Sequence, residues 1–297
     1  MNNELRVAIL IVAHKGQKQL DKLIEQLKPS FNLYIHLDKK SQLIVNETEN
    51  VKVIKDYKVY WGSREQILVT KKLLELAVKD KNDWYLLISG QDIPLCSNSE
   101  IIQRLSKEKK SHFSFSKLVI NNPKINKLII DDMTSLKSDV IRRLALFHFN
   151  IFRRENNLRS KILAKFQWFI HAFQKRFGFY RVFPQNVRVG SNWFNLTHEA
   201  VEVLLQNLTK KTLRRYKFTS CADEIFVQTI LLNSKLKNKC INNDLRLTDL
   251  DYEIEETKIY TVSDIEQMLN SKKLFARKVD EEKDIRLINK IYELVGI

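Results

Sequence analysis

Residues 7–13 read Val-Ala-Ile-Leu-Ile-Val-Ala, and residues 84–89 read Trp-Tyr-Leu-Leu-Ile-Ser. Both runs are almost entirely apolar, and both have the length of a strand rather than of a helix. A strand with apolar side chains on both faces is typical of a parallel sheet that helices cover on both sides. The two runs therefore predict an α/β fold built on a buried parallel sheet.

The chain between these two runs alternates between helix and strand patterns. We predict an amphipathic helix near 17–28, strands at 31–37 and near 51–55, and a long helix from Trp61-Gly62-Ser63 to about residue 79. This alternation is typical of strand–helix–strand units in a parallel sheet.

Four residues follow the predicted strand ends closely in the first hundred residues. They are His14, Asp38, Trp61 and Asp92. Ligands of open α/β sheets bind outside the carboxyl ends of the strands, so these residues mark a candidate binding site.

The composition fits a globular protein of one large domain or two small ones that attracts anions. The 297 residues carry a net charge of +16, which favours nucleic acid, acidic lipid or a phosphorylated substrate without choosing among them. Three irregularly spaced cysteines indicate a reducing compartment and give no metal motif. The run at 7–13 is too short to span a bilayer and no signal peptide is visible, so we expect a cytoplasmic protein.

Residues 140–188 are unusually basic and aromatic. They contain eleven Lys or Arg, eleven aromatic residues and a single acid, Glu155. One interpretation is a solvated basic face over an aromatic core. Another is an amphipathic segment on an anionic membrane surface. Binding of single-stranded nucleic acid is a third interpretation, which no recognisable motif supports.

The later part of the chain returns to mixed helix and strand patterns. We predict a strand at 187–196, a helix that starts at Thr197, a strand at 244–250, and two terminal helices near 262–270 and 280–294.

A nearly apolar helix is predicted at 219–232, Thr-Ser-Cys-Ala-Asp-Glu-Ile-Phe-Val-Gln-Thr-Ile-Leu-Leu, with two carboxylates in its first turn. Ser220 and Asp223 have the spacing of a capping box with Ser220 as N-cap. Glu224 lies within roughly 20° of Leu231 on a helical wheel. A carboxylate against apolar neighbours can have a raised pKa and act as a base. The alternative is a structural salt bridge between Glu224 and a nearby cation.

Metal chemistry has little support in the sequence. There is no phosphate-binding loop, dinucleotide fingerprint, nucleophile elbow or zinc-ligand spacing. Sugar-nucleotide enzymes that use Mg²⁺ or Mn²⁺ often place an Asp-x-Asp pair after an early strand, where this chain has Gln91-Asp92-Ile93-Pro94 with one acid. A single carboxylate is a poor site for such ions, so we predict a metal-independent protein.

A metal-free enzyme with a diphosphate leaving group needs fixed cations instead. Arg246 and the cluster Lys272, Lys273, Arg277 and Lys278 are the candidates. The alternative for Arg246 is an ion pair with Asp244 or Asp249. The alternative for Lys278 is an ordinary solvated lysine.

Six segments, taken in order along nearly the whole chain, resemble one family. They are Ile-His-Leu-Asp-Lys-Lys-Ser (35–41), the Trp61-Gly62 turn, Ser-Gly-Gln-Asp-Ile-Pro-Leu-Cys-Ser-Asn-Ser-Glu-Ile (89–101), Gly-Ser-Asn-Trp-Phe-Asn-Leu-Thr-His-Glu-Ala-Val (190–201), Ser-Cys-Ala-Asp-Glu-Ile-Phe-Val-Gln-Thr (220–229) and Leu-Phe-Ala-Arg-Lys-Val-Asp (274–280). The chain is similar to the core-2/I-branching β-1,6-N-acetylglucosaminyltransferases, a family that includes peptide O-xylosyltransferases. The resemblance implies a glycosyltransferase A-type (Rossmann-like) mixed sheet flanked by helices, and an inverting, metal-independent transfer from a UDP-sugar with no cofactor.

The resemblance also implies roles for individual residues. The acceptor-activating base of the family falls on Glu224, its diphosphate-binding cations fall on Arg246 and Lys278, and its uridine-side acid falls on Asp38. We expect His14, Trp61 and Asp92 to line the donor side as well. The residues that the resemblance places at the sugar and acceptor are Gly190, Ser191, Asn192 and Trp193, with Asp223 in a supporting position.

Residues 1–104 are expected to form a nucleotide-binding half, 105–188 a helical insertion that faces acceptor or membrane, and 189–297 the acceptor and catalytic half of a single domain. We expect a bacterial-type enzyme of surface polysaccharide synthesis that transfers N-acetylglucosamine, xylose or a hexose to a glycan or lipid-linked glycan. It would be cytoplasmic, with possible peripheral contact between residues 140–188 and the inner face of the plasma membrane, and would bind no nucleic acid. The rival hypothesis is a non-catalytic basic module that binds nucleic acid or anionic membrane. Two departures from the animal members stand out: three cysteines without a membrane anchor, and Ala222 where many members have proline.

Overall fold

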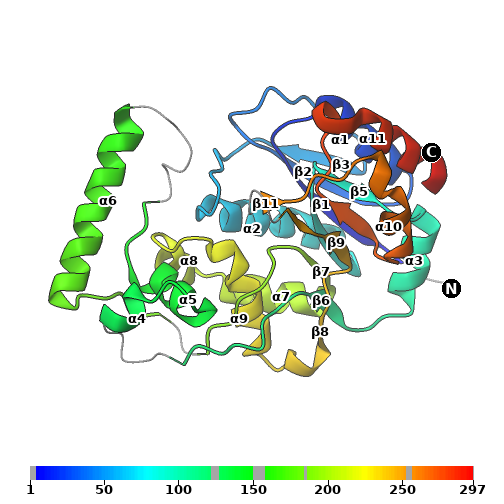
Figure 1. The fold of residues 1–297 in the computed structure, drawn as a ribbon. Helices are drawn as coiled ribbons and strands as arrows, with labels where there is room; N and C mark the ends of the chain where they lie inside the picture. The colour runs from blue at the N-terminus through cyan, green and yellow to red at the C-terminus, as the bar shows by residue number, and fades with distance from the viewer. Residues whose placement is uncertain (1–4, 122–126, 150–157, 184–185, 252–255, 297) are drawn as a thin grey trace.

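A seven-stranded sheet forms the centre of the molecule in the computed structural model, which describes residues 5–121, 127–149, 158–183, 186–251 and 256–296 (Figure 1). The strand order is β3-β2-β1-β4-β7-β6-β8. The strands are β1 (Val7–Ala13), β2 (Asn32–Leu37), β3 (Val51–Ile54), β4 (Trp84–Ser89), β6 (Ser111–Phe113), β7 (Phe194–Thr197) and β8 (Cys240–Asn242).

The continuous apolar character of β1 has a direct cause in the sheet. β1 pairs in parallel with β2 on one side and with β4 on the other, so that Leu10 lies opposite both Tyr34 and Leu87. Ala8 and Leu10 belong to the core on one face of the sheet, and Ile9 and Ile11 to the core on the other face. The buried parallel sheet predicted from these runs is therefore confirmed.

The other half of the sheet is mixed. β7 is antiparallel to both β4 and β6, and β8 pairs in parallel with β6. The mixed sheet flanked by helices that the resemblance implies is thus present. β6 lies inside the range 105–188 and belongs to the central sheet, so the helices of that range begin only after this strand.

Helices cover both faces of this sheet. The face that includes Ile9 is covered by α1 (Gln17–Leu27) and α3 (Asn98–Ser106), which contribute Leu20, Leu23, Ile101 and Leu105 to its core. The face that includes Leu10 is covered by α2 (Glu65–Ala77) and α7 (His198–Asn207), and the same core extends away from the sheet to α9 (Phe226–Leu232) and α5 (Leu136–Ala145). α2 continues into the short helix η1 (Val78–Asp80).

A second, three-stranded sheet brings the end of the chain to the loop that follows β4. Its strands are ordered β5 (Asp92–Pro94), β12 (Phe275–Arg277) and β9 (Arg246–Thr248). β12 runs parallel to β9 and antiparallel to β5, so that Arg277 lies opposite Asp92. The helix α11 (Glu281–Val295) packs against this sheet in a third core.

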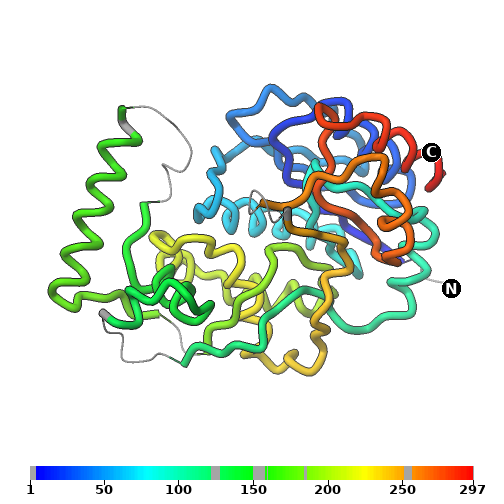
Figure 2. Tube along the Cα trace, viewed as in Figure 1, coloured from blue at the N-terminus to red at the C-terminus, as the bar shows by residue number. Residues whose placement is uncertain are grey.

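The remaining elements, with the exception of the long helix α6, are short and lie around these two sheets. They are α4 (Lys127–Asp131), α6 (Leu158–Phe177), α8 (Lys210–Tyr216), η3 (Ala222–Glu224), η4 (Lys237–Lys239), β10 (Leu250–Asp251), β11 (Glu256–Thr257), η5 (Val262–Asp264) and α10 (Ile265–Asn270). α6 stands apart from the body of the molecule at the left of Figure 1, and the chain trace in Figure 2 shows the same separation. Within the described residues, no helix combines the length and the apolar character that crossing a bilayer requires.

Candidate active site

Asp38 is fixed at the carboxyl end of β2, next to the end of β1. Its backbone N–H donates to the carbonyl oxygen of Ala13 at 2.8 Å. Its carboxylate accepts from the backbone N–H of Lys40 at 2.8 Å and from that of Val59 at 3.3 Å, and the residue is only 5% exposed. Because backbone groups hold both oxygens, the carboxylate has a fixed direction at the edge of the sheet.

His14 follows β1 at the same edge of the sheet as Asp38, and its imidazole is neutral there. Partial loss of surrounding water lowers the pKa of its imidazole, although His14 is an exposed residue. The charges of Lys15, Lys278 and Arg277 lower the pKa further, against the opposing effect of Asp38. A neutral imidazole offers one donor and one acceptor, which suits recognition of an uncharged polar group.

Asp92, at the start of β5, is fully buried and sits between two arginines. The Oδ2 atom of Asp92 lies 3.1 Å from the Nε of Arg246, and its Oδ1 lies 3.1 Å from the Nη1 of Arg277. Ser89 also donates to Oδ1 at 3.1 Å. A buried carboxylate needs such partners to remain charged.

The ion-pair partner of Arg246 differs from the sequence-based alternatives. Its side chain pairs with Asp92, whereas Asp244 accepts only from the backbone N–H of Arg246 at 3.2 Å. The side chain of Arg246 is 1% exposed and donates from Nη2 to the carbonyl oxygen of Leu87 at 3.1 Å. Among the described residues, its Nη1 has no hydrogen-bond partner. A bound anion can therefore reach this guanidinium only after a neighbouring side chain moves.

Trp193 is the neighbour that covers the two arginines. The guanidinium carbon of Arg246 lies 4.9 Å from the centroid of the Trp193 ring, and that of Arg277 lies 4.6 Å from it. Both distances are within the range of cation–π attraction. The indole thus holds two like charges close together without neutralising them.

Lys278 directly follows β12 and adds a further positive charge. Desolvation lowers the pKa of its ammonium group, and the charges of Arg277 and Lys15 lower it further. None of the carboxylates that the structure describes forms an ion pair with Lys278, whereas Lys15 pairs with Asp280 at 2.6 Å. The four cations predicted as one cluster do not lie together, because Lys272 and Lys273 precede β12 and lie at its other end. The carbonyl oxygen of Lys272 accepts a hydrogen bond from Arg104, and the side chain of Lys273 donates one to Asn243.

Gly190 to Trp193 form the segment that joins these cations to the predicted base. A Cβ atom on Gly190 would lie 1.9 Å from the carbonyl oxygen of Ser114, so only glycine fits this approach of two backbones. The N–H of Gly190 donates to the backbone oxygen of Glu224 at 2.8 Å. Three peptide units span at most about 11 Å, so Trp193 and the Glu224 turn must lie close together.

Two side chains support this segment from either side. The N–H of Ser191 donates to the hydroxyl of Ser114 at 2.9 Å, and the amide of Gln228 donates to the Ser191 carbonyl at 2.6 Å. The buried Oδ1 of Asn192 has no hydrogen-bond partner among the described residues. Asn192 therefore retains an acceptor in a segment that is otherwise held by hydrogen bonds.

Glu224 lies in a different local structure from the one predicted. The chain forms the short 3₁₀ helix η3 and starts α9 only at Phe226. Cys221 precedes η3 in the left-handed conformation, with φ of 49°, and makes no side-chain cap. The predicted capping box of Ser220 and Asp223 is therefore wrong, because the left-handed turn at Cys221 separates Ser220 from the start of the helix.

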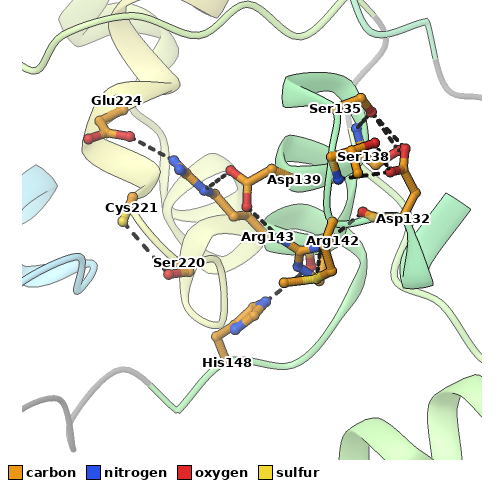
Figure 3. A network of polar contacts seen from close by, with 12 residues as sticks. Asp132, Ser135, Ser138, Asp139, Arg142, Arg143, His148, Ser220, Cys221 and Glu224 are labelled. Carbon is orange, nitrogen blue, oxygen red and sulfur yellow. Dashed lines mark hydrogen bonds and ion pairs between the residues drawn. The ribbon is translucent and has the colours of Figure 1, made fainter. Parts of the chain in front are cut away.

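The carboxylate of Glu224 is 36% exposed and accepts from the Nη1 of Arg143 at 2.7 Å (Figure 3). The Nε of Arg143 in turn lies 2.7 Å from the Oδ2 of Asp139 on the same helix, α5. The alternative of a salt bridge at Glu224 is thus present, with a partner from the insertion. The Glu224 carboxylate is therefore partly exposed and paired with a cation, instead of being enclosed by apolar side chains.

The carboxyl group with a raised pKa is its neighbour, Asp223. Burial raises the pKa of Asp223 to about 7, and the charge of Glu224 contributes to this rise. With its amide nitrogen turned toward Asp223, Gln66 of α2 donates to both carboxylate oxygens. Asp223 is 7% exposed, so it supports the turn from inside.

Trp61 is brought to the Glu224 turn. The N–H of Cys221 donates to the carbonyl oxygen of Gly62 at 2.9 Å, which places the Trp61-Gly62 turn beside η3. The Trp61 side chain is 54% exposed. This position suits contact with a sugar or an acceptor as well as with the donor nucleotide.

Two residues of the site, Arg143 and Lys15, were not predicted from the sequence, and a third, Arg277, was predicted only as one of a group of cations. Arg143 lies among eleven bases in 140–188, and nothing in that run singles it out. Lys15 directly follows the His14 position and could have been noticed there. Arg277 was named in the cation cluster but given no role. No three described His, Cys, Asp or Glu side chains lie close enough together to hold a metal ion.

Comparison with known families and proteins gives consistent similarities. The family model described as Core-2/I-Branching enzyme matches residues 7–272. Xylosyltransferase 2 of Mus musculus is 27% identical over 264 residues, which cover 82% of this chain and 26% of that protein. Xylosyltransferase 1 of Homo sapiens is 25% identical over 267 residues, which cover 83% and 24%. The chain thus spans about a quarter of the length of these relatives.

Among solved structures, a protein titled mannose-1-phosphate geranyltransferase, from Thermus thermophilus, is similar with a TM-score of 0.32 and 10% sequence identity. The match covers 75% of this chain and 71% of that one.

Proposed function

The chain belongs to the Core-2/I-branching enzyme family, a family of glycosyltransferases, and on that premise we propose that it moves a sugar from a UDP-sugar to an acceptor hydroxyl with inversion and without a metal ion. The observation that carries this proposal is the arrangement around residues 190–193. One end of this segment is bonded to the backbone of Glu224, and the other end places Trp193 against Arg246 and Arg277. A carboxylate base and a surplus of positive charge thus lie on either side of one short segment.

Glu224 is the proposed general base. The acceptor O–H gives its proton to the Glu224 carboxylate while the acceptor oxygen attacks the anomeric carbon from the face opposite the leaving group. The bond between the anomeric carbon and the diphosphate oxygen breaks, and UDP leaves with the electron pair. A partly exposed carboxylate that Arg143 holds in one direction suits this proton transfer.

Arg277 and Lys278 are the proposed first contacts of the diphosphate. Negative charge grows on the leaving group as the glycosidic bond breaks, and fixed cations in a partly desolvated position stabilise it. Lys278 has no described ion-pair partner, and Arg277 is 20% exposed. Arg246 would act after Trp193 moves, since its guanidinium is covered.

Asp38 and His14 are the proposed contacts of the nucleoside. Their position at the carboxyl ends of β2 and β1 is where open α/β sheets bind ligands. The neutral imidazole and the amide-bound carboxylate fit the uncharged donors and acceptors of a uridine. The nucleotide-binding half thus extends beyond residues 1–104 to the cations contributed by β9 and the end of β12.

Metal independence is supported by the partners of Asp92. Its two oxygens already face Arg246 and Arg277, so the carboxylate that follows β4 is not available to Mg²⁺ or Mn²⁺ in this arrangement. We infer that these two guanidinium groups take the place that a divalent ion has in metal-dependent sugar-nucleotide enzymes.

N-acetylglucosamine, xylose and a hexose remain the candidate sugars, and the relatives named xylosyltransferase favour including UDP-xylose in any screen. We propose a glycan or lipid-linked glycan as acceptor, in surface polysaccharide synthesis at the cytoplasmic side of a membrane.

Calorimetric titration with UDP tests the nucleotide site directly. We expect the wild-type protein to bind UDP, and Lys278→Ala to weaken binding by about ten- to a hundredfold, as expected for a lost charged contact. Lys272→Ala is the matched control, since this exposed lysine lies at the other end of the same strand. Absence of UDP binding by the wild-type protein, or equal loss in both variants, would contradict the proposal and favour a non-catalytic basic module.

A further inference from the structure

The outer face of α6 carries a continuous apolar stripe. Its members follow one another at intervals of four, four, three, four and four residues and are between 48% and 75% exposed. They are Leu158, Ile162, Phe166, Phe169, Phe173 and Phe177. At 100° per residue, this spacing places all six within about a third of the helix circumference.

The opposite face of α6 is fixed to the rest of the insertion. Gln174 donates to the carbonyl oxygens of Phe179 at 2.9 Å and Ala145 at 3.3 Å. His171 bonds to the carbonyl oxygen of Phe147 at 2.8 Å, and Lys175 pairs with Asp131 at 2.6 Å. These contacts set the rotation of the helix. The apolar stripe therefore faces solvent, except that the ring of Phe166 also contacts that of Phe149, with 5.6 Å between their centroids.

Positive charge accompanies the stripe. Residues 158–183 contain six Lys or Arg and no Asp or Glu. Lys161, Lys165 and Arg176 are exposed, and their places on the helical wheel lie along one border of the stripe. A partner that covers this face must therefore be apolar in its interior and negatively charged at its surface.

We propose that the outer face of α6 binds to the surface of an anionic lipid bilayer. The helix lies in the plane of the interface, with the six apolar side chains at the boundary between headgroups and acyl chains and the basic residues against lipid phosphates. A 20-residue helix is about 30 Å long, so the stripe contacts lipid along its whole length. Trp168, which is 72% exposed, lies outside the stripe, on the basic side of the helix.

Charge and shape disfavour the other partners for this face. A second copy of the same face would bring two basic surfaces together without any acid to pair with them. A nucleic acid strand would stack on aromatic rings, whereas Leu158 and Ile162 occupy the first two positions of the stripe.

The proposed location has a consequence for catalysis that rests on the proposed function. α6 is bonded to Ala145 and Phe147, at the end of the helix α5 that carries Arg143. Binding of α6 to lipid therefore keeps α5, and through Arg143 the Glu224 turn, attached to an element that lies on the membrane in which such acceptors are anchored.

Co-sedimentation with lipid vesicles tests the binding without requiring transferase activity. We expect the protein to bind vesicles of phosphatidylglycerol and phosphatidylcholine, and to bind pure phosphatidylcholine at least tenfold more weakly. The double variant Lys161→Ala/Lys165→Ala is expected to bind the anionic vesicles more weakly, by on the order of tenfold or more. Added salt should also weaken the binding of the wild-type protein to these vesicles.

Phe169→Glu/Phe173→Glu is expected to abolish the binding, and Leu294→Glu is its control. Leu294 is 50% exposed on α11, at the opposite side of the molecule in Figure 1. Thermal melting and UDP titration of each variant show whether it is folded. Failure of the folded wild-type protein to bind anionic vesicles at low salt overturns the proposal, as does binding that the Phe169/Phe173 variant retains. Self-association or oligonucleotide binding that depends on these two phenylalanines, without vesicle binding, also overturns it. None of these results bears on whether the protein transfers sugar to a soluble acceptor.

Discussion

Arg143 donates from Nη1 to the Oε2 of Glu224 at 2.7 Å, although the two residues are 81 positions apart in the chain. Arg143 belongs to α5 in the insertion, and Glu224 to the turn that precedes α9. Figure 3 shows that the same guanidinium also contacts Asp139, which fixes it from the opposite side. The insertion therefore sets the direction of the proposed base.

Replacement of Arg143 tests this positioning role. We expect Arg143→Ala to lower kcat by about ten- to a hundredfold, since small misplacements of a catalytic group have effects of this size. UDP affinity should stay unchanged, and Arg143→Lys should restore part of the rate. The control is Arg142→Ala, because Arg142 also pairs with Asp139 but bonds to Asp132 and Met133 instead of Glu224. Equal losses for both alanine variants would indicate a general disturbance of α5.

Glu224→Gln separates base catalysis from binding. The amide keeps the size of the side chain but cannot accept the acceptor proton, so we expect kcat to fall by about 10²- to 10⁴-fold. UDP binding, measured by calorimetry, should remain close to that of the wild-type protein. Glu199→Gln is the control, since Glu199 is a surface carboxylate paired with Lys239. Transfer at the wild-type rate by Glu224→Gln would remove Glu224 from the mechanism.

The parallel half of the fold was predictable because its signal is local. β1 and β4 are apolar on both faces, and only a sheet covered on both sides accepts such strands. The strand predicted at 187–196 is present only as β7, from Phe194 to Thr197, and the three residues of β6 are too few to show a period. β6 was therefore assigned to the insertion.

The partners within the site were less predictable, because they come from distant parts of the chain. Arg246 was expected to pair with Asp244 or Asp249, its neighbours in sequence, but its guanidinium reaches Asp92 across the second sheet. Ser220 and Asp223 have the correct spacing for a capping box, but the box does not form because the left-handed Cys221 separates Ser220 from the start of the helix. Residue types and spacing thus identified the positions, while tertiary contacts decided the pairings.

Removal of divalent cations tests the proposed electrostatic role of the arginines. Because Arg246 and Arg277 already neutralise Asp92, we expect transfer activity to be unchanged by excess EDTA. Addition of Mg²⁺ or Mn²⁺ after dialysis should produce no more than about a twofold change through general ionic effects. Loss of activity with EDTA and rescue by Mn²⁺ would overturn the metal-free mechanism.

Asp223 predicts a specific dependence of stability on pH. Its folded-state pKa is raised from 3.8 to about 7. As the pH rises from about 4 to 7, the unfolded state therefore releases this proton while the folded state retains it, and stability falls. Asn cannot ionise, so Asp223→Asn should become more stable relative to the wild-type protein across this range, by roughly 2–4 kcal/mol for a shift of this size. Urea denaturation at several pH values measures the difference.

The matched control for this pH series is Glu199→Gln. The hydrogen bond from Lys239 lowers the pKa of Glu199. The difference in the free energy of unfolding between Glu199→Gln and the wild-type protein should therefore stay near zero or have the opposite sign over the same pH range. A flat difference for Asp223→Asn between pH 4 and 7 would mean that Asp223 titrates as an ordinary carboxyl group. In that case solvent, or a stronger hydrogen bond from Gln66, would offset the effect of burial on the pKa of Asp223. A rising difference would instead show that Asp223 is protonated in the folded protein below about pH 7.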